Sequence, residues 1–134
     1  MEKVRILFVS AMLSAVAVGM AAVSPLPYRQ QFSDDASLAD FTVIDGDGNG
    51  LTWKIDLGAA CNPGNQDNTD DWLITPGFSM EKGKMYNVRF TAWGSSYYEM
   101  FEVKAGTDPT AAGMTEPFIE ARQVQGNTFS PLSV

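Results

Sequence analysis

The sequence predicts an all-β protein, either a sandwich or a barrel. Short runs rich in β-branched and aromatic residues alternate with Gly, Asn, Asp and Pro, which is the pattern of strands joined by turns. No stretch shows sustained helical periodicity, and residues 34–40 alone have helical potential. The length of 134 residues allows one domain and argues against two.

The chain begins with the features of an export signal. Lys3 and Arg5 make the start basic, and residues 6–18 follow without a charge. Gly19 and Ala21 then supply small residues at the two positions that specify cleavage. We therefore expect residues 1–21 to be a cleaved signal peptide.

A transmembrane anchor is the alternative, because no charge appears until Arg29. Gly19, Pro25 and Pro27 interrupt the apolar run, and no basic stop-transfer cluster follows it, so the cleaved signal is favoured. The expected domain then spans residues 22–134, with no transmembrane segment after cleavage. Its expected location is outside the cell or on the cell surface, with the bacterial periplasm as a further option.

Alternation and turn residues predict the first three strands. Residues 41–44 form the first strand, and residues 51–55, which alternate between apolar and polar, form the second. Residues 58–71 have almost no apolar content and are expected to be a loop. Residues 72–75 form the third strand, which Pro76 ends.

Two further strands are expected to pair as an antiparallel hairpin. Residues 84–93 form the longest predicted strand. Residues 97–105 form the next one, with Glu102 and Lys104 facing water. A weaker strand is expected over residues 117–124.

The sharpest local signal is the sequence DGDGNG over residues 45–50. Asp45, Asp47 and Asn49 occupy positions 1, 3 and 5 of a calcium loop, with glycine at position 6. Position 12 is Asp56. The flanking segments are strand-like and not helical, which favours a calcium loop between strands over an EF-hand.

This motif also has a second interpretation. Asp-Gly and Asn-Gly are strong hairpin-turn signals that need no metal, so a plain hairpin connection stays open. Asp67, Asp70 and Asp71 form a second acidic group, which either completes the same site from a neighbouring loop or is solvated. The candidate calcium ligands are Asp45, Asp47, Asn49, Asp56, Asp70 and Asp71.

The aromatic residues suggest another type of site. Trp53, Trp72 and Trp93 lie on or beside strands, where most aromatic side chains are expected to be in the core. Tyr97 and Tyr98 are neighbours in a predicted strand and therefore point to opposite faces. One of the two is a candidate ligand-binding residue that stacks on a sugar.

The composition excludes several functions. The chain has no histidine, which removes Ser-His-Asp and Cys-His nucleophilic sites and histidine-ligated zinc. A net charge of −7 argues against binding nucleic acid. The one cysteine, Cys61, is expected to be a free thiol in a loop. No acidic pair is singled out for glycoside hydrolysis, so an enzyme is not expected.

Four segments carry a resemblance to a known family. They are PLPY at residues 25–28, FTVIDGDGNGLTW at 41–53, DDWLITP at 70–76 and YEMFEVKAGTDPT at 98–110. In this order they resemble bacterial cleaved-adhesin modules, also called choice-of-anchor J domains, which are similar to the adhesin modules of gingipain-type proteases.

The resemblance implies a calcium-stabilised jelly-roll β-sandwich related to carbohydrate-binding and MAM-type modules. Such modules are exported, non-catalytic and used for adhesion to proteins or glycans. By motif position, Asp45, Asp47, Asn49, Asp70 and Asp71 are the metal-side candidates. Modules of the family continue through further strands, and residues 128–134 alternate without a terminating signal. We therefore expect an incomplete jelly roll of five or six strands, the N-terminal portion of a module.

Three functions follow from these observations. The first is an exported adhesion module, stabilised by calcium, that recognises an extracellular protein or glycan. The alternative is the ancillary carbohydrate-binding domain of a glycan-degrading protein. A small carboxylate-based hydrolase is the third hypothesis, and the sequence gives it the least support.

Overall fold

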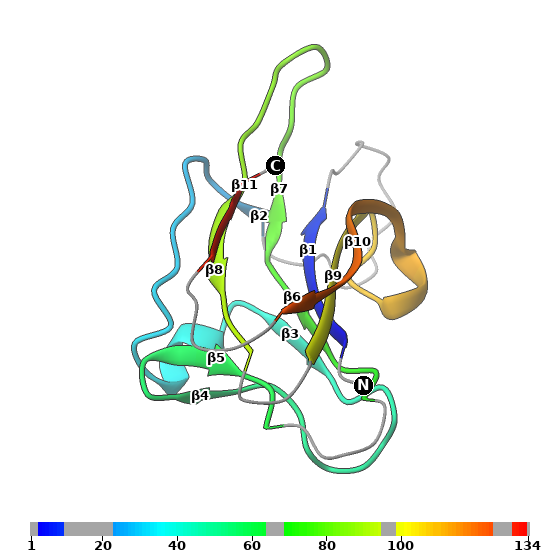
Figure 1. Cartoon of the computed structure of the whole chain (residues 1–134). Coiled ribbons are helices and arrows are strands. Elements are labelled where there is room, and N and C mark those ends of the chain that lie inside the picture. Colours follow the sequence, from blue (N-terminus) through cyan, green and yellow to red (C-terminus); the bar gives the residue numbers. More distant parts are fainter. Residues whose placement is uncertain (1–2, 10–22, 64–68, 95–98, 125–129, 134) are drawn as a thin grey trace.

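The computed structural model describes residues 3–9, 23–63, 69–94, 99–124 and 130–133. They form an all-β protein, as the sequence predicts, and the described helical structure consists of two short 3₁₀ helices, η1 (Asp35–Leu38) and η2 (Ala111–Gly113) (Figure 1). The described strands are β1 (Lys3–Val9), β2 (Val23–Ser24), β3 (Thr42–Ile44), β4 (Lys54–Asp56), β5 (Ala59–Cys61), β6 (Trp72–Ile74), β7 (Gly77–Phe78), β8 (Arg89–Ala92), β9 (Glu99–Gly106), β10 (Met114–Val124) and β11 (Ser130–Ser133). They outnumber the five or six strands expected because the structure adds short strands at both ends of the chain and between the predicted ones.

Five strands make the main sheet, in the order β10-β9-β1-β6-β3. The central strand, β1, is parallel to both of its neighbours, β6 and β9. The two edge strands, β3 and β10, are antiparallel to β6 and β9 respectively. In Figure 1, β1 is the blue strand that lies between β6 and β9.

β1 lies within the N-terminal segment that the sequence predicts to be a signal peptide. Its sequence, KVRILFV, ends in four consecutive apolar residues, which is typical of a parallel strand covered on both faces. The cleaved signal peptide over residues 1–21 stays a prediction, because the fold does not test whether the chain is exported and cleaved. What the structure adds is that part of the same segment forms the middle of a sheet.

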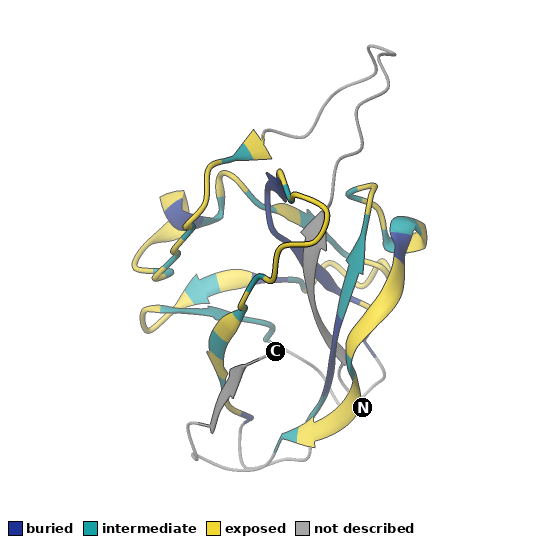
Figure 2. Ribbon diagram, turned by 90° about the horizontal axis from the view of Figure 1, so that it is seen from above, coloured by how far each residue is buried: buried dark blue, intermediate teal, exposed yellow. Residues whose placement is uncertain are grey.

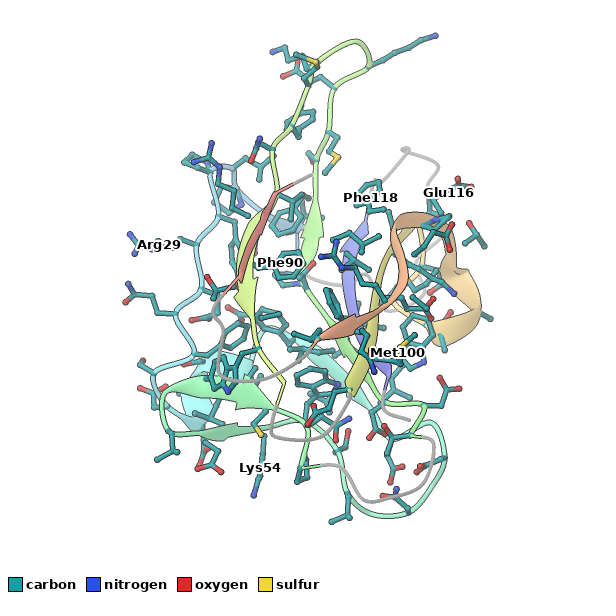
Figure 3. The ribbon with its side chains drawn as sticks, viewed as in Figure 1. Arg29, Lys54, Phe90, Met100, Glu116 and Phe118 are labelled. Carbon is teal, nitrogen blue, oxygen red and sulfur yellow. The ribbon has the colours of Figure 1, made fainter. Side chains whose placement is uncertain are left out.

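Shorter strand pairs accompany the main sheet. β8 pairs antiparallel with β11, and β2 pairs parallel with β7. The Phe90 ring of β8 meets the Phe101 ring of β9 edge to face, with centroids 6.3 Å apart, and Figure 3 shows Phe90 between β8 and the main sheet. The Tyr28 ring packs on the Phe78 ring of β7 at an interplanar angle of 55°, with centroids 5.2 Å apart. This packing is sandwich-like, and the jelly-roll strand order stays a prediction.

The core lies on both faces of the main sheet. Trp72 and Ile74 of β6 cluster with Met114 on one face, and Leu73, whose side chain alternates to the other face, is also buried. β10, in contrast, is exposed along most of its length, as Figure 2 shows. Among the strands whose burial is described, the main sheet is therefore most deeply buried at β6 and in the middle of β9.

The predicted hairpin of residues 84–93 and 97–105 is wrong. Its first half is a strand only over β8, which pairs with β11, whereas β9 belongs to the main sheet. Residues 79–88 form a connection that projects from the body of the molecule (Figure 1), and Met85 there is 98% exposed. Apolar alternation predicts a strand, but without a neighbouring strand to pair with, these residues do not extend β8.

The prediction that Glu102 faces water is also wrong. Its side chain is buried and forms an ion pair with Lys104, at 3.3 Å. The ammonium of Lys104 also lies 5.8 Å from the centroid of the Trp72 ring. Alternation places Glu102 on the face opposite Phe101 and Val103, but both faces of β9 are covered at these residues.

The segment between the second and third predicted strands is more regular than expected. β4 begins three residues after the predicted start at residue 51, and β5 pairs with it antiparallel inside the predicted loop of residues 58–71. Gly58 makes the turn between them with a φ of +76°. Cys61 is the last residue of β5 and is half-buried, so the expectation of a loop cysteine is wrong.

The other strand predictions are confirmed in place. β3 and β6 coincide with the predicted first and third strands, and β10 contains the weak strand predicted over residues 117–124. The segment with helical potential forms η1, which Asp34 caps by accepting from the Ser37 backbone N–H. Among the described residues, no helix has both the length and the apolar character needed to cross a membrane.

Candidate metal site

The candidate site lies at one end of the β3–β6 ladder. These two strands are antiparallel, and their register pairs Ile44 with Trp72. Asp45 follows Ile44 directly and Asp71 directly precedes Trp72, so the next position of the ladder places the two aspartates opposite each other. Like charges directly opposite across two strands are destabilising. A cation between them would remove this repulsion.

The loop after β3 folds around its own acidic side chains. Asp45 accepts hydrogen bonds from the backbone N–H groups of Gly48 at 2.7 Å, Asn49 at 3.2 Å and Gly50 at 2.8 Å. These bonds, the one from Gly50 foremost, hold the pKa of Asp45 below its usual value. Asp47 in turn accepts from both the backbone N–H and the side-chain amide of Asn49. The loop therefore fixes both carboxylates in position and favours the ionised form of Asp45.

The Asp71 carboxyl lies in a different environment, with 0% of its surface exposed. It accepts from the backbone N–H of Gly46 at 3.3 Å and from the Asn62 side-chain amide at 2.9 Å. Burial raises its pKa most, and the nearby charges of Asp47 and Asp45 raise it further, against the two hydrogen bonds. Without a cation, ionised Asp71 is the unfavourable member of this group.

The three carboxylates converge on one point. Asp45, Asp47 and Asp71 each offer an oxygen atom, and these atoms lie within 4.8 Å of one another. Calcium binds oxygen ligands at about 2.3–2.6 Å, so two ligands on opposite sides of one ion are about 5 Å apart at most. The donor set and its spacing therefore fit a calcium ion. Each carboxylate also keeps lone pairs that its hydrogen bonds do not use.

A close backbone approach holds the loop against the strand that carries Asp71. A Cβ built on Gly46 would collide with the carbonyl oxygen of Asp70. Only glycine allows this contact, because every other residue has a Cβ at that place. Gly46 thus has a role that the calcium-loop pattern does not predict: it lets the two aspartate-bearing segments meet.

The structure groups some of the predicted ligands and separates others. The acidic group contains Asp45, Asp47 and Asp71, whereas Asp56 ends β4 and is not part of it. Asp70 contributes its backbone contact with Gly46, and its carboxylate is not part of the group either. The Asn49 amide is turned toward Asp47, at 2.8 Å. Asp67, Tyr97 and Tyr98 lie outside the described residues.

Asn62 is a residue of the site that the sequence reasoning missed, and Thr69 is a buried residue near Asp71 in the sequence. Asn62, just after β5, donates a hydrogen bond from its side-chain amide to Asp71. Its position in a polar segment did not predict this long-range contact. Thr69 is 2% exposed, and its Oγ1 has no hydrogen-bond partner within the part of the chain that the structure describes. It lies two residues before Asp71.

The tryptophans divide as expected for a small β protein. Trp53 and Trp72 are buried, and Trp93, just after β8, is 44% exposed. An exposed indole offers a flat apolar face on which a sugar ring can stack. Among the described residues, Trp93 is therefore one candidate for sugar stacking.

Comparison of the chain with family models, with curated proteins and with solved structures found no match. The resemblance to cleaved-adhesin modules accordingly stays a prediction from the sequence.

Proposed function

We propose that this chain is an exported, non-catalytic adhesion module in which calcium locks the β3–β6 junction. Its partner would be an extracellular protein or glycan, and its location would be secreted or on the cell surface. The fold supports this proposal, because an all-β scaffold presents loops on a rigid frame, the usual arrangement in binding proteins. The absence of histidine and the signal-like N-terminus point the same way.

The observation that carries the proposal is the buried Asp71 opposite Asp45. A fully buried carboxylate with two more carboxylates within 4.8 Å is unfavourable unless a cation neutralises the group. Calcium fits because all the donors are oxygen atoms and their spacing suits its long bonds. The ion would join a loop after β3 to the start of β6 and so stiffen one end of the main sheet.

The test is thermal unfolding of the full chain in calcium and in EDTA. Sites of extracellular modules bind calcium with a Kd of about 0.1–1 mM. At ten times the Kd, binding adds about 1.4 kcal/mol of stability, which raises Tm by about 5 °C for a domain of this size. A melting curve that does not respond to either EDTA or calcium would contradict the proposal.

A matched pair of variants identifies the ligands. Asp71→Asn removes a charge from the acidic group and should abolish the calcium response. Asp56→Asn removes a charge from an exposed position outside that group and should keep the response. If both variants lose it equally, the position-12 ligand of the sequence motif takes part as well, and the site is larger than the three carboxylates.

A second function, the ancillary carbohydrate-binding domain, is favoured by the exposed Trp93. Stacking of a sugar on an exposed indole typically leads to weak binding that depends on that one ring. Glycan-array binding by the wild type that Trp93→Ala abolishes, with Tm unchanged, would support this function. Binding to a protein receptor with no glycan signal would support adhesion to proteins.

A further inference from the structure

We propose that Asn49 undergoes self-catalysed deamidation, with the Gly50 backbone nitrogen as the attacking group and Asp45 as the group that takes its proton. The reaction turns the Asn49 side chain into a carboxylate and so changes the ligand set of the acidic loop of residues 45–50. The chemistry uses water and no metal ion, so it does not depend on the calcium site. Its effect on calcium binding does rest on the proposed function.

The pair Asn49-Gly50 has the composition that this reaction needs. The Gly50 nitrogen and the carbonyl carbon of the Asn49 side chain, Cγ, are separated by four bonds, so a bond between them closes a five-membered ring. Glycine favours the closure because it has no Cβ to obstruct it. Both residues are exposed, so water can reach the ring. The other asparagines of the chain precede Pro, Gln, Thr or Val, which makes this its one Asn-Gly pair.

Each of the three reacting groups is held by a different hydrogen-bond partner. The Gly50 N–H donates to Asp45 Oδ2 at 2.8 Å. The Leu51 backbone N–H donates to Asn49 Oδ1 at 2.6 Å. The Asn49 side-chain Nδ2 donates to Asp47 Oδ2 at 2.8 Å. The nucleophile, the carbonyl oxygen and the leaving nitrogen are thus positioned separately.

These contacts match the demands of the attack. The Gly50 nitrogen forms a bond to Asn49 Cγ, and its N–H becomes more acidic as that bond forms. Asp45 Oδ2, which already accepts this N–H, takes the proton and acts as a general base. Negative charge develops on Asn49 Oδ1, where the Leu51 N–H stabilises it as a donor of an oxyanion hole does.

Expulsion of ammonia completes the ring. The electron pair on Oδ1 forms the carbonyl again while the bond from Cγ to Nδ2 breaks. The nitrogen leaves as ammonia with the proton that Asp45 took, which water carries to it. The product is a cyclic imide in which the Gly50 nitrogen is bonded to both carbonyl carbons of residue 49.

Water then opens the ring at one of two bonds. Cleavage of the bond between the Gly50 nitrogen and Cγ gives aspartate at position 49. Cleavage of the bond between the same nitrogen and the main-chain carbonyl carbon gives isoaspartate, in which the main chain runs through Cγ. Each product has one more carboxylate than the original chain.

The two products change the loop in opposite ways. Aspartate at position 49 replaces the amide donor that faces Asp47 by another carboxylate. This adds repulsion without a cation, but it adds an anionic oxygen ligand of the type that calcium prefers when the ion is bound. Isoaspartate lengthens the main chain by one atom and displaces the Gly50 N–H from Asp45. Calcium affinity should therefore rise in the first product and fall in the second.

The first test follows the full chain in EDTA beside a synthetic peptide DGDGNGLT, the sequence of residues 45–52. Mass spectrometry of a digest measures replacement of the Asn49 amide by an acid, and electron-transfer fragmentation separates aspartate from isoaspartate. A fold that only restricts the chain slows this reaction relative to a flexible peptide. We expect the folded chain to react at least about tenfold faster than the peptide, because a positioned general base contributes that much or more. A folded chain that reacts at the rate of the peptide or more slowly would overturn the proposal.

Asp45→Ser identifies the group that takes the proton. It removes the carboxylate without creating a second Asn-Gly pair, which Asp45→Asn would create with Gly46. Loss of the hydrogen bonds to Asp45 loosens the loop, and loosening alone speeds deamidation. A rate at least about tenfold below the wild type therefore reports the loss of the base. An unchanged or faster rate would show that Asp45 does not act in this way.

Asp56→Ser is the matched control, because Asp56 is exposed and ends β4 outside the acidic group. It should keep the wild-type rate of deamidation. Equal slowing in Asp45→Ser and Asp56→Ser would assign the effect to the net charge of the chain and contradict the role of Asp45.

The direct variant Asn49→Asp reproduces the aspartate product. Isothermal titration should show that it binds calcium several-fold more tightly than the wild type. Its Tm in EDTA should be lower, because the added carboxylate repels its neighbours. Calcium binding that is no tighter would overturn the predicted gain of a ligand.

The same rates measured in saturating calcium separate this inference from the proposed function. A bound ion occupies the Asp45 carboxylate, so calcium should slow the reaction several-fold in the wild type and have no effect in Asp71→Asn. The expected rate in EDTA with no effect of calcium on rate or Tm would keep the deamidation and remove the metal site. A calcium-dependent Tm in a chain that reacts no faster than the peptide would do the reverse.

Discussion

The acidic loop of residues 45–50 and the strand β1 are both short segments. The loop is shaped by contacts between residues close in the sequence, whereas β1 is held by pairing with residues far away in the sequence. The hydrogen bonds that shape the loop join residues two to five positions apart. β1 pairs only with residues 72–74 and 100–106. Local chemistry determines the first segment, and the rest of the sheet determines the second.

The difference has a consequence for function. A loop built by its own side chains keeps its shape when a neighbour changes, so it can present ligands for a metal before the metal arrives. A strand built by distant partners keeps its place only while those partners offer unpaired edges. The same apolar sequence can therefore serve as an export signal in one context and as a sheet strand in another.

Proline at Ile6 gives the largest expected effect and tests the β1 half of this comparison. Ile6 pairs with Leu73 on one side and Val103 on the other, and proline removes a backbone donor from the middle of the sheet. We expect the full chain to lose about 3 kcal/mol, since a buried carbonyl also loses its partner. Urea unfolding measures the loss.

Met85→Pro is the control for this change, because Met85 is 98% exposed and lies outside any strand. It should change the stability by less than about 0.5 kcal/mol. If both prolines have the same small effect, β1 does not contribute to the stability of the sheet.

Gly46→Ala tests the acidic loop of residues 45–50, the second segment of the comparison, and is expected to have the next largest effect on stability. The new Cβ would meet the Asp70 carbonyl, so the loop and the start of β6 must separate. We expect a loss of about 2 kcal/mol together with loss of the calcium response. Isothermal titration with calcium and urea unfolding measure the two effects separately.

Gly48→Ala separates conformational strain from this close contact. Gly48 has a φ of +70°, and a Cβ there would meet nothing within 4 Å. The left-handed conformation costs a non-glycine residue about 1 kcal/mol, with calcium binding retained. Equal losses of calcium binding in the two variants would show that loop conformation, and not the approach to Asp70, holds the site.

The sequence predicted the local features of this molecule better than the distant ones. The strands β3 and β6 were predicted because each is a compact β-branched or apolar run that ends at a polar residue or proline. The loop carboxylates Asp45 and Asp47 were predicted as candidate ligands from their spacing alone. Their grouping with Asp71 matches one of the two alternatives given for the second acidic group, namely that it completes the same site.

What the sequence did not predict depends on pairing between distant segments. Residues 84–88 alternate like a strand but lie in a projecting connection, because no strand of the described residues pairs with them. Glu102 looks solvent-facing by its charge, yet both faces of β9 are covered. The contact of Asn62 with Asp71 and the need for glycine at position 46 likewise arise only when the two loops meet. No local pattern encodes these contacts.

The pH dependence of the calcium-free protein gives the smallest expected effect and isolates Asp71. Its pKa is raised in the folded state by burial and by Asp47 and Asp45. A raised pKa means that the stabilising contribution of the protonated form is complete below the unfolded value of about 3.9 and is lost as the pH rises through the folded pKa. In EDTA at pH 7, Asp71→Asn should therefore melt above the wild type, by about 2 °C.

The difference in Tm between Asp71→Asn and the wild type in EDTA should narrow as the pH falls, because protonation of Asp71 in the wild type removes the charge that the variant lacks. In calcium at pH 7 the order should reverse, since the ion stabilises only the protein that keeps the carboxylate. Thermal unfolding at pH 4, 5.5 and 7, with and without calcium, measures both changes. A variant that melts below the wild type in EDTA at every pH would mean that the hydrogen bonds from Gly46 and Asn62 outweigh the repulsion. Asp71 would then be a structural carboxylate that needs no cation. The loop of residues 45–50 would be the plain turn without a metal that its Asp-Gly and Asn-Gly pairs also predict.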